Sequence, residues 1–122
     1  MARVLIIEDS PLIVQMLTMV CEGAGHTVTS TEQFSGVAAL LADSPEVIIT
    51  DLNLPDVPGG DALSALKGLD EFDDTPIIII SGRPVAELEE IARTSGAQGA
   101  LSKDDGMPVI SGKLPGMIDS LV

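Results

Sequence analysis

The chain has 122 residues, and its 19 acidic side chains against 6 basic ones give a formal net charge of −13. A surface this negative repels nucleic-acid phosphates and anionic lipid, so we expect no direct binding to DNA, RNA or a membrane. The length suits one domain spanning residues 1–122, with no run of roughly 20 apolar residues that could cross a membrane, and we expect a cytoplasmic protein.

Short apolar runs alternate with segments of helical spacing in the first half of the chain. Residues 4–7 predict the first strand. Ser10 then suits the N-cap of a helix and Pro11 its first position, and apolar residues continue at helical spacing as far as Cys21. Two further strands are predicted at 26–29 and 47–50, with a second helix between them that is marked by Val37, Leu40 and Leu41.

The second half of the chain begins with a third predicted helix, marked by Leu63, Leu66 and Leu69. A strand is predicted at 77–80, where four isoleucines follow one another without a polar residue. Strands that are buried on both faces have this composition, as in a parallel sheet covered by helices.

The last third of the chain predicts two more helices around a fifth strand. In the fourth helix the apolar residues from Leu88 to Ala92 face inward, and the strand at 97–101 follows. Helical spacing continues in the tail, but we expect Pro115 and Gly116 to interrupt the fifth helix there.

The alternation of strands and helices defines the fold class. It indicates βαβ units, and hence an α/β fold with a parallel sheet and right-handed crossovers. Five strands in so short a chain favour a flavodoxin-like, doubly wound sheet in the order 2-1-3-4-5 with helices on both faces.

Polar residues with a potential for chemistry follow the ends of four predicted strands. Ligands of such sheets bind beyond the carboxyl ends of the strands, beside the switch point between strands 1 and 3. Glu8 and Asp9 follow strand 1, Asp51 follows strand 3, Ser81 strand 4 and Lys103 strand 5. Three converging carboxylates repel one another unless a cation is present, and hard oxygen ligands suit Mg²⁺. Separate acids in solvated loops are the alternative.

Four motifs at these strand ends resemble those of a response-regulator receiver domain. Together they extend from the first strand to the fifth, and each falls where a strand end is predicted independently. The motifs are Ile7-Glu8-Asp9-Ser10, Asp51-Leu52-Asn53-Leu54-Pro55 followed by Gly59-Gly60, Ile80-Ser81-Gly82, and Gly99-Ala100-Leu101-Ser102-Lys103.

The resemblance implies a role for each matching residue. Asp51 would accept a phosphoryl group, and Asp9 and Asp51 would ligate Mg²⁺ together with the backbone carbonyl of Asn53. Glu8 would act largely through a metal-bound water. The other implied positions are Ser81 and Lys103, which would contact the phosphoryl oxygens, and Asn53 and Arg83, which would tune the lifetime of the acyl phosphate.

The resemblance also implies the partners of the chain. The phosphoryl donor would be a sensor histidine kinase or a histidine phosphotransfer protein, and the output would be a downstream effector protein. Such a domain acts as a phosphoryl-accepting switch, not as an enzyme with turnover.

Three positions depart from the pattern of the family. Ala100 stands where an aromatic residue is usual, so the ring that tracks the hydroxyl of Ser81 is missing. Asp104 replaces the usual proline after the lysine and is placed to compete for its ammonium group. The third departure is the interruption of the last helix that Pro115 predicts.

Three other functions compete with the phosphoryl-accepting switch. A pseudo-receiver would bind its partners without phosphorylation. The departures at Ala100 and Asp104 favour it, whereas the retention of all the site residues argues against it: Glu8, Asp9, Asp51, Ser81 and Lys103. A phosphatase with an aspartyl-phosphate intermediate would place an acid two residues after the nucleophile, where this chain has Asn53, which cannot act as a general acid. A flavin-binding flavodoxin would need a hydroxyl-rich loop after the first strand and aromatic residues that stack on the flavin ring, and this sequence lacks both.

Overall fold

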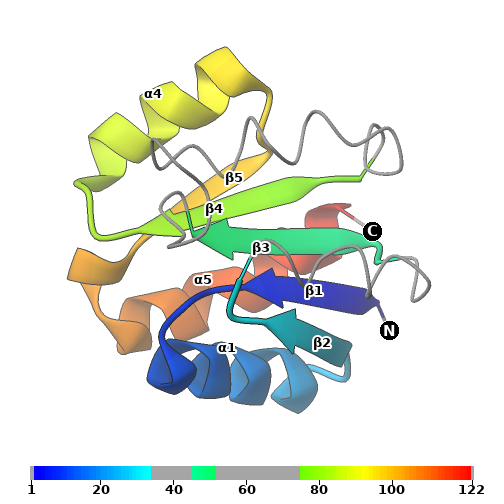
Figure 1. The fold of residues 1–122 in the computed structure, drawn as a ribbon. Coiled ribbons are helices and arrows are strands. Elements are labelled where there is room, and N and C mark those ends of the chain that lie inside the picture. Colours follow the sequence, from blue (N-terminus) through cyan, green and yellow to red (C-terminus); the bar gives the residue numbers. More distant parts are fainter. Residues whose placement is uncertain (1, 34–44, 52–74, 122) are drawn as a thin grey trace.

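A computed structural model describes residues 2–33, 45–51 and 75–121 of the chain (Figure 1). The helices predicted around Leu40 and Leu66 lie outside the described residues, as does Asn53. The described elements are β1 (Arg3–Ile7), α1 (Pro11–Gly23), β2 (Thr27–Thr31), β3 (Val47–Asp51), β4 (Ile77–Ser81), α4 (Val85–Ser95), β5 (Gly99–Ser102), the 3₁₀ turn η5 (Lys103–Asp105) and α5 (Met107–Leu121).

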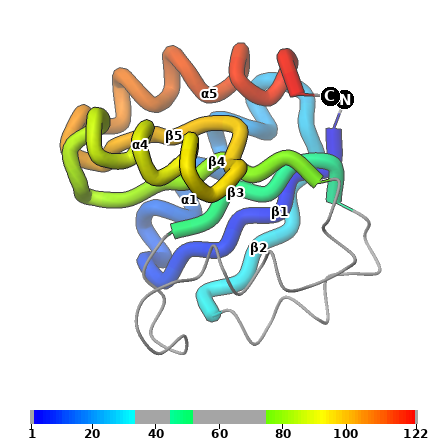
Figure 2. The backbone as a smooth tube through the Cα atoms, turned by 90° about the horizontal axis from the view of Figure 1, so that it is seen from above, coloured from blue at the N-terminus to red at the C-terminus, as the bar shows by residue number. Residues whose placement is uncertain are grey.

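The five strands form one parallel sheet in the order β2-β1-β3-β4-β5, which confirms the predicted topology. The central strands β3 and β4 are buried along their whole length, as their apolar sequences require. Strand β2 is partly exposed because it lies at the edge of the sheet, and β5 forms the other edge beside α4 (Figure 2).

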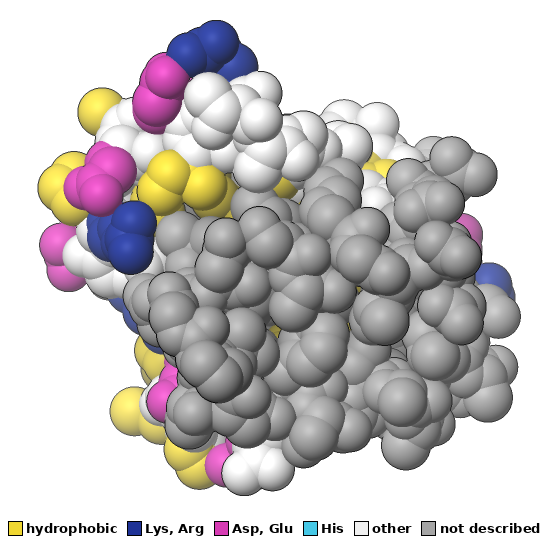
Figure 3. Space-filling model, turned by 45° about the horizontal axis from the view of Figure 1, so that its top comes forward, with side chains coloured by type: hydrophobic (Ala, Val, Ile, Leu, Met, Phe, Trp, Pro, Cys, Tyr) yellow, Lys and Arg dark blue, Asp and Glu magenta, His cyan; other side chains and the backbone are white. Residues whose placement is uncertain are grey.

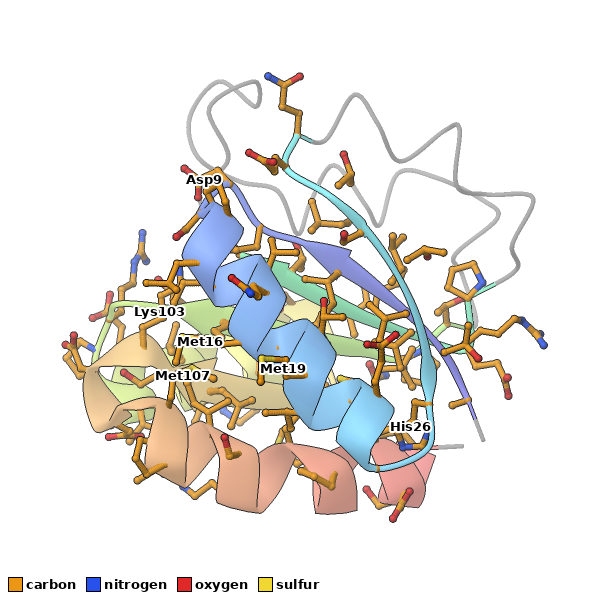
Figure 4. The ribbon with its side chains drawn as sticks, turned by 90° about the horizontal axis from the view of Figure 1, so that it is seen from below. Asp9, Met16, Met19, His26, Lys103 and Met107 are labelled. Atoms are coloured by element: carbon orange, nitrogen blue, oxygen red, sulfur yellow. The ribbon has the colours of Figure 1, made fainter. Side chains whose placement is uncertain are left out.

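Successive side chains of a strand point to opposite faces, so each face of the sheet has its own core. On one face, Ile78, Ile80 and Leu101 pack in a cluster with residues of α1 and α5, two helices that lie side by side (Figure 4). The residues between them on the strands, such as Ile79 and Ala100, therefore point to the opposite face. Helix α4, whose Leu88 and Ala92 are buried, packs against β5 outside that cluster.

Helix α5 runs without a break from Met107 to Leu121, so the predicted interruption at Pro115 is wrong. A proline inside a helix costs about 3 kcal/mol. The buried side chains Ile110, Leu114 and Ile118 of the same helix recur at helical spacing in the core. Each contributes about 1.5–3 kcal/mol when it is fully buried, and together they outweigh the cost of Pro115. None of the described helices is long and apolar enough to cross a membrane.

The start of β2 also differs from its prediction. The strand begins at Thr27 and not at His26, because the backbone N–H of His26 donates to the carbonyl of Cys21 at the end of α1 (3.0 Å). The side chain of His26 is buried, and its Nδ1 accepts the backbone N–H of Ala2 at 3.0 Å. His26 thus closes the α1–β2 turn and holds the start of β1.

Candidate functional site

The predicted site residues meet at the carboxyl edge of the sheet. Glu8 and Asp9 directly follow β1, and Asp51 is the last residue of β3, the neighbour of β1 in the sheet. One carboxylate oxygen from each of the three lies within 4.8 Å of the others. Asp9 is exposed, whereas Glu8 and Asp51 are buried. The predicted convergence of the three carboxylates is therefore found.

Lys103 brings a positive charge to this edge from the turn after β5. Its Nζ donates to Oε1 of Glu8 and to Oδ2 of Asp51, each at 2.9 Å. Burial lowers the pKa of Lys103, but the hydrogen bonds and charges of the two carboxylates outweigh it and raise this pKa. The side chain is 24% exposed, so the ammonium group partly neutralises the site while it stays within reach of a ligand.

Asp104 does not compete for this ammonium group. Its side chain is exposed, and the ion pairs that Lys103 makes in the described part of the chain are with Glu8 and Asp51. The reason lies in the 3₁₀ turn Lys103–Asp105, in which the hydroxyl of Ser102 accepts the backbone N–H of Asp104. Asp104 is exposed in this turn, whereas the side chain of Lys103 reaches Glu8 and Asp51 at the sheet edge.

Glu8 is fully buried, and its two oxygens differ in their partners. Oε1 accepts hydrogen bonds from Lys103 and from the backbone N–H of Ser10 (3.2 Å). Oε2 is buried and has no hydrogen-bond partner among the described residues. Burial, together with the charge of Asp51, raises the pKa of Glu8 to about 7, although the hydrogen bond from Lys103 lowers it. A buried carboxylate oxygen without a partner fits a cation or a water bound to one.

The acid cluster therefore fits a divalent cation that prefers oxygen ligands. Glu8, Asp9 and Asp51 could hold Mg²⁺, which usually keeps several of its waters and takes one or two carboxylates. The exposed Asp9 leaves one side of the cluster open to solvent, as entry of a hydrated ion requires. The predicted fourth ligand, the carbonyl of Asn53, lies outside the described residues.

The hydroxyl residue Ser81 and the tuning position Arg83 occupy different surroundings, while the second tuning position, Asn53, lies outside the described residues. Ser81 ends β4 and is buried, beside Asp51 in the sheet, because Asp51 lies opposite Ile80. Arg83 is exposed, and its Nη1 lies 3.5 Å from Oε1 of Glu87 on α4. A second ion pair joins Arg93 to Glu90 on the same helix, and acidic and basic side chains lie beside each other on this part of the surface (Figure 3).

Ala100 lines a hollow between α4, β5 and α5, of about 380 Å³. The other lining residues include the small Ala92, Ala97 and Gly99, with Met117 at the α5 side. The methyl group of Met117 packs directly against the backbone of Gly99, so a side chain at position 99 would collide with it. The missing aromatic ring thus leaves open space that no side chain of the described residues fills.

The sequence analysis assigned no role to Ser102, which the structure places next to the site. Its buried hydroxyl donates to the carbonyl of Arg83 at 2.7 Å. The serine lies two residues before Asp104, a spacing typical of a hydroxyl that caps a turn. The turn-capping role of Ser102 can be predicted from the sequence. Its bond to Arg83 cannot, because the two residues are 19 positions apart in the chain.

The fold and the site together define a class of protein. A parallel sheet in this order is a flavodoxin-like α/β domain, and its acid cluster beside the switch point, faced by a lysine, could hold a cation. The chain belongs to the response regulator receiver domain family, whose model matches residues 4–113. Receiver domains are signalling domains of two-component systems, which confirms the resemblance that the strand-end motifs indicated.

Curated proteins and solved structures agree with this membership. The KDP operon transcriptional regulatory protein KdpE of Escherichia coli is 32% identical over 115 residues, which cover 93% of this chain and 50% of KdpE. The chain thus spans about half the length of that relative. Protein PilH of Pseudomonas aeruginosa is 32% identical over 104 residues, which cover 84% of this chain and 86% of PilH. The structure of the chemotaxis response regulator CheY4 of Vibrio cholerae superposes on this one with a TM-score of 0.79 at 26% sequence identity. The superposition covers 96% of this chain and 98% of the CheY4 chain.

Proposed function

We propose that this chain accepts a phosphoryl group on Asp51 from a phosphohistidine of a partner protein, in a reaction that requires Mg²⁺. The observation that carries the proposal is the position of Lys103, whose Nζ is 2.9 Å from both Glu8 and Asp51. Phosphoryl transfer needs a nucleophile in line with the leaving group and positive charge near the phosphoryl oxygens. Asp51 supplies the nucleophile and Lys103 supplies part of the charge.

The transfer itself breaks one bond and forms another. A carboxylate oxygen of Asp51 attacks the phosphorus, the P–N bond to the donor imidazole breaks, and the imidazole leaves with the electron pair. The product is an acyl phosphate on Asp51. Lys103 exchanges its hydrogen bond to Asp51 for one to a phosphoryl oxygen, and the hydroxyl of Ser81 donates to another.

The metal would be held by the same edge of the sheet. Asp9 and Asp51 would ligate Mg²⁺ directly, with the backbone carbonyl of Asn53, and Glu8 would hold a metal-bound water through its unpartnered Oε2. The bound ion supplies positive charge to the phosphoryl oxygens and to the acid cluster.

The partners follow from the family and from this chemistry. The donor would be a sensor histidine kinase or a histidine phosphotransfer protein, and phosphorylation would change the binding of a downstream effector protein. Arg83 and Asn53 would tune the lifetime of the acyl phosphate, and the protein would be cytoplasmic. A chain of this net charge is not expected to bind nucleic acid directly.

Incubation with acetyl phosphate or phosphoramidate and Mg²⁺ should add one phosphoryl group to the wild type, as measured by intact mass. Hydroxylamine should remove it, because it cleaves acyl phosphates. Asp51→Asn should abolish the labelling, since an amide oxygen is a far weaker nucleophile than a carboxylate. Asp119→Asn, which changes an exposed carboxylate near the end of α5, is the matched control and should label normally. Equal labelling of wild type and Asp51→Asn would contradict the proposal, and no labelling of the wild type would favour the pseudo-receiver.

Mg²⁺ should raise the midpoint of thermal unfolding by mass action, since it binds the clustered carboxylates of the folded chain. At about 100 times its Kd the ion should stabilise the fold by about 2.7 kcal/mol. Asp9→Asn should remove most of this gain and leave the apo fold intact, because Asp9 is exposed. Circular dichroism is the suitable probe, as the chain has neither Trp nor Tyr. A full Mg²⁺ effect in Asp9→Asn would show that the metal site lies elsewhere.

A further inference from the structure

Ser102, the last residue of β5, carries a buried hydroxyl that joins two other segments. The hydroxyl donates to the backbone carbonyl of Arg83 at 2.7 Å, in the loop between β4 and α4. It also accepts the backbone N–H of Asp104 at 3.2 Å, in the 3₁₀ turn that begins at Lys103. The residue is 1% exposed, so water cannot readily replace either bond.

The two segments that Ser102 joins are those that carry the proposed phosphoryl contacts. Ser81 and Ser102 lie opposite each other in the sheet, at the ends of β4 and β5. Arg83 follows Ser81 by two residues, and Lys103 follows Ser102 directly. A displacement of the loop after Ser81 therefore acts on the turn of Lys103 through one side chain.

Besides the hydroxyl of Ser102, the backbone pairing of β4 with β5 connects the two segments. Side chains two residues apart on a strand point to the same face, so Ala100 and Ser102 face the same side of the sheet, toward α4. Ala100 ends in a methyl group beside an open hollow. Gly82 is exposed, and a Cβ built on it would meet nothing within 4 Å. Among the residues that the structure describes, the hydroxyl of Ser102 makes the side-chain hydrogen bond that joins this loop to β5, in addition to the backbone pairing of Ser81 with Ser102.

We propose that Ser102 is a positioning residue that makes the loop after Ser81 and the turn of Lys103 move as one unit. The inference rests on the proposed phosphorylation of Asp51. When Ser81 and Lys103 both turn toward the phosphoryl group, the bond from Ser102 to Arg83 keeps their displacements in step. Ser102 itself touches neither the phosphoryl group nor the metal.

The test compares two substitutions of almost the same shape, Ser102→Thr and Ser102→Val. Thr keeps the hydroxyl, whereas Val leaves the Arg83 carbonyl and the Asp104 N–H without this partner. Both side chains are β-branched and suit a strand, so differences in folding are kept small. Labelling with acetyl phosphate should be about tenfold slower in the Val variant and near wild type in the Thr variant.

A spectroscopic readout separates coupling from a general loss of structure. Amide NMR with beryllofluoride, which mimics the phosphoryl group, should shift Gly82 and Arg83 together with Lys103–Asp105 in the wild type and in Ser102→Thr. In Ser102→Val at saturating beryllofluoride, the shift changes of Gly82 and Arg83 should fall well short of their wild-type size, while those of Lys103–Asp105 are retained. A double-mutant cycle should also find Ser81→Ala less harmful in the Val background than in the wild type, because the two serines act through one path.

The results distinguish this inference from the proposed function. If the wild type is not labelled at all, the proposed function fails. If the wild type is labelled and Ser102→Val behaves like Ser102→Thr in rate, shifts and cycle, only the role of Ser102 is overturned. A Val variant that retains the Mg²⁺ stabilisation but is labelled slowly supports the positioning role.

Discussion

Replacing Lys103 with methionine should slow the phosphorylation of Asp51 by about 100-fold and, at the same time, tighten the binding of Mg²⁺. The first effect follows from the loss of a preorganised cation at the phosphoryl oxygens, where one such donor contributes a factor of about 10²–10³. The second follows from the geometry of the free site, because the Nζ of Lys103 lies 2.9 Å from oxygens of Glu8 and Asp51. These are the carboxylates that the ion would use, so the ammonium group and Mg²⁺ compete for them.

Opposite changes in rate and in metal affinity are difficult to obtain from a misfolded protein. Initial labelling rates at saturating Mg²⁺ measure the first effect, and calorimetric titration measures the second. Lys113→Met is the matched control, because Lys113 is an exposed lysine on α5, and both quantities should remain those of the wild type. Weaker Mg²⁺ binding by Lys103→Met would mean that the lysine helps to hold the ion's ligands in place and does not compete for them.

Glu8→Gln should make the metal-free protein more stable than the wild type at pH 8, and this advantage should disappear near pH 4.5. Burial raises the pKa of Glu8 to about 7 in the folded chain, against an ordinary value of 4.5. Between these two values the folded state retains a proton on Glu8 that the unfolded state has released. The free energy of unfolding of the wild type must therefore fall as the pH rises through this window, by about 3 kcal/mol from this group. Glutamine does not titrate, so the variant lacks this fall.

Urea unfolding in the presence of EDTA, followed by circular dichroism at several pH values, measures the difference. The difference between the two curves gives the contribution of the Glu8 carboxyl together with its interactions with Asp51 and Lys103. Glu22→Gln, at an exposed glutamate of α1, should give the wild-type curve. The same pH dependence in Glu8→Gln and in the wild type would show that Glu8 is ionised throughout this range.

Strand order and the convergence of the site were predictable because both depend on local sequence features. The isoleucine run of β4 has the composition of a strand that is buried on both faces. A polar residue that follows such a run lies at the edge of the sheet even when the predicted end of the strand is wrong by one or two residues. Asp51 and Ser81 illustrate this, since each ends a strand that was predicted to stop just before it.

The features that the sequence did not predict depend on contacts between distant segments. Helix α5 continues through Pro115 because Leu114 and Ile118 are buried against the sheet, and helix propensity alone does not predict that burial. The start of β2 involves His26, whose Nδ1 accepts the backbone N–H of Ala2, 24 residues away in the sequence. The bond of Ser102 to Arg83 likewise appears only when β4 and β5 are paired.

Lys103 also gives this sheet edge an internal counter-ion, and this has a consequence for how the domain folds. In a structural zinc domain the metal contributes the free energy of folding, and a chelator unfolds the chain. Here a side chain of the same polypeptide already lies between Glu8 and Asp51, so the repelling carboxylates are assembled before any ion arrives. We therefore expect the newly synthesised chain to fold without metal, and an ion bound at this cluster would be able to leave and return without unfolding the domain.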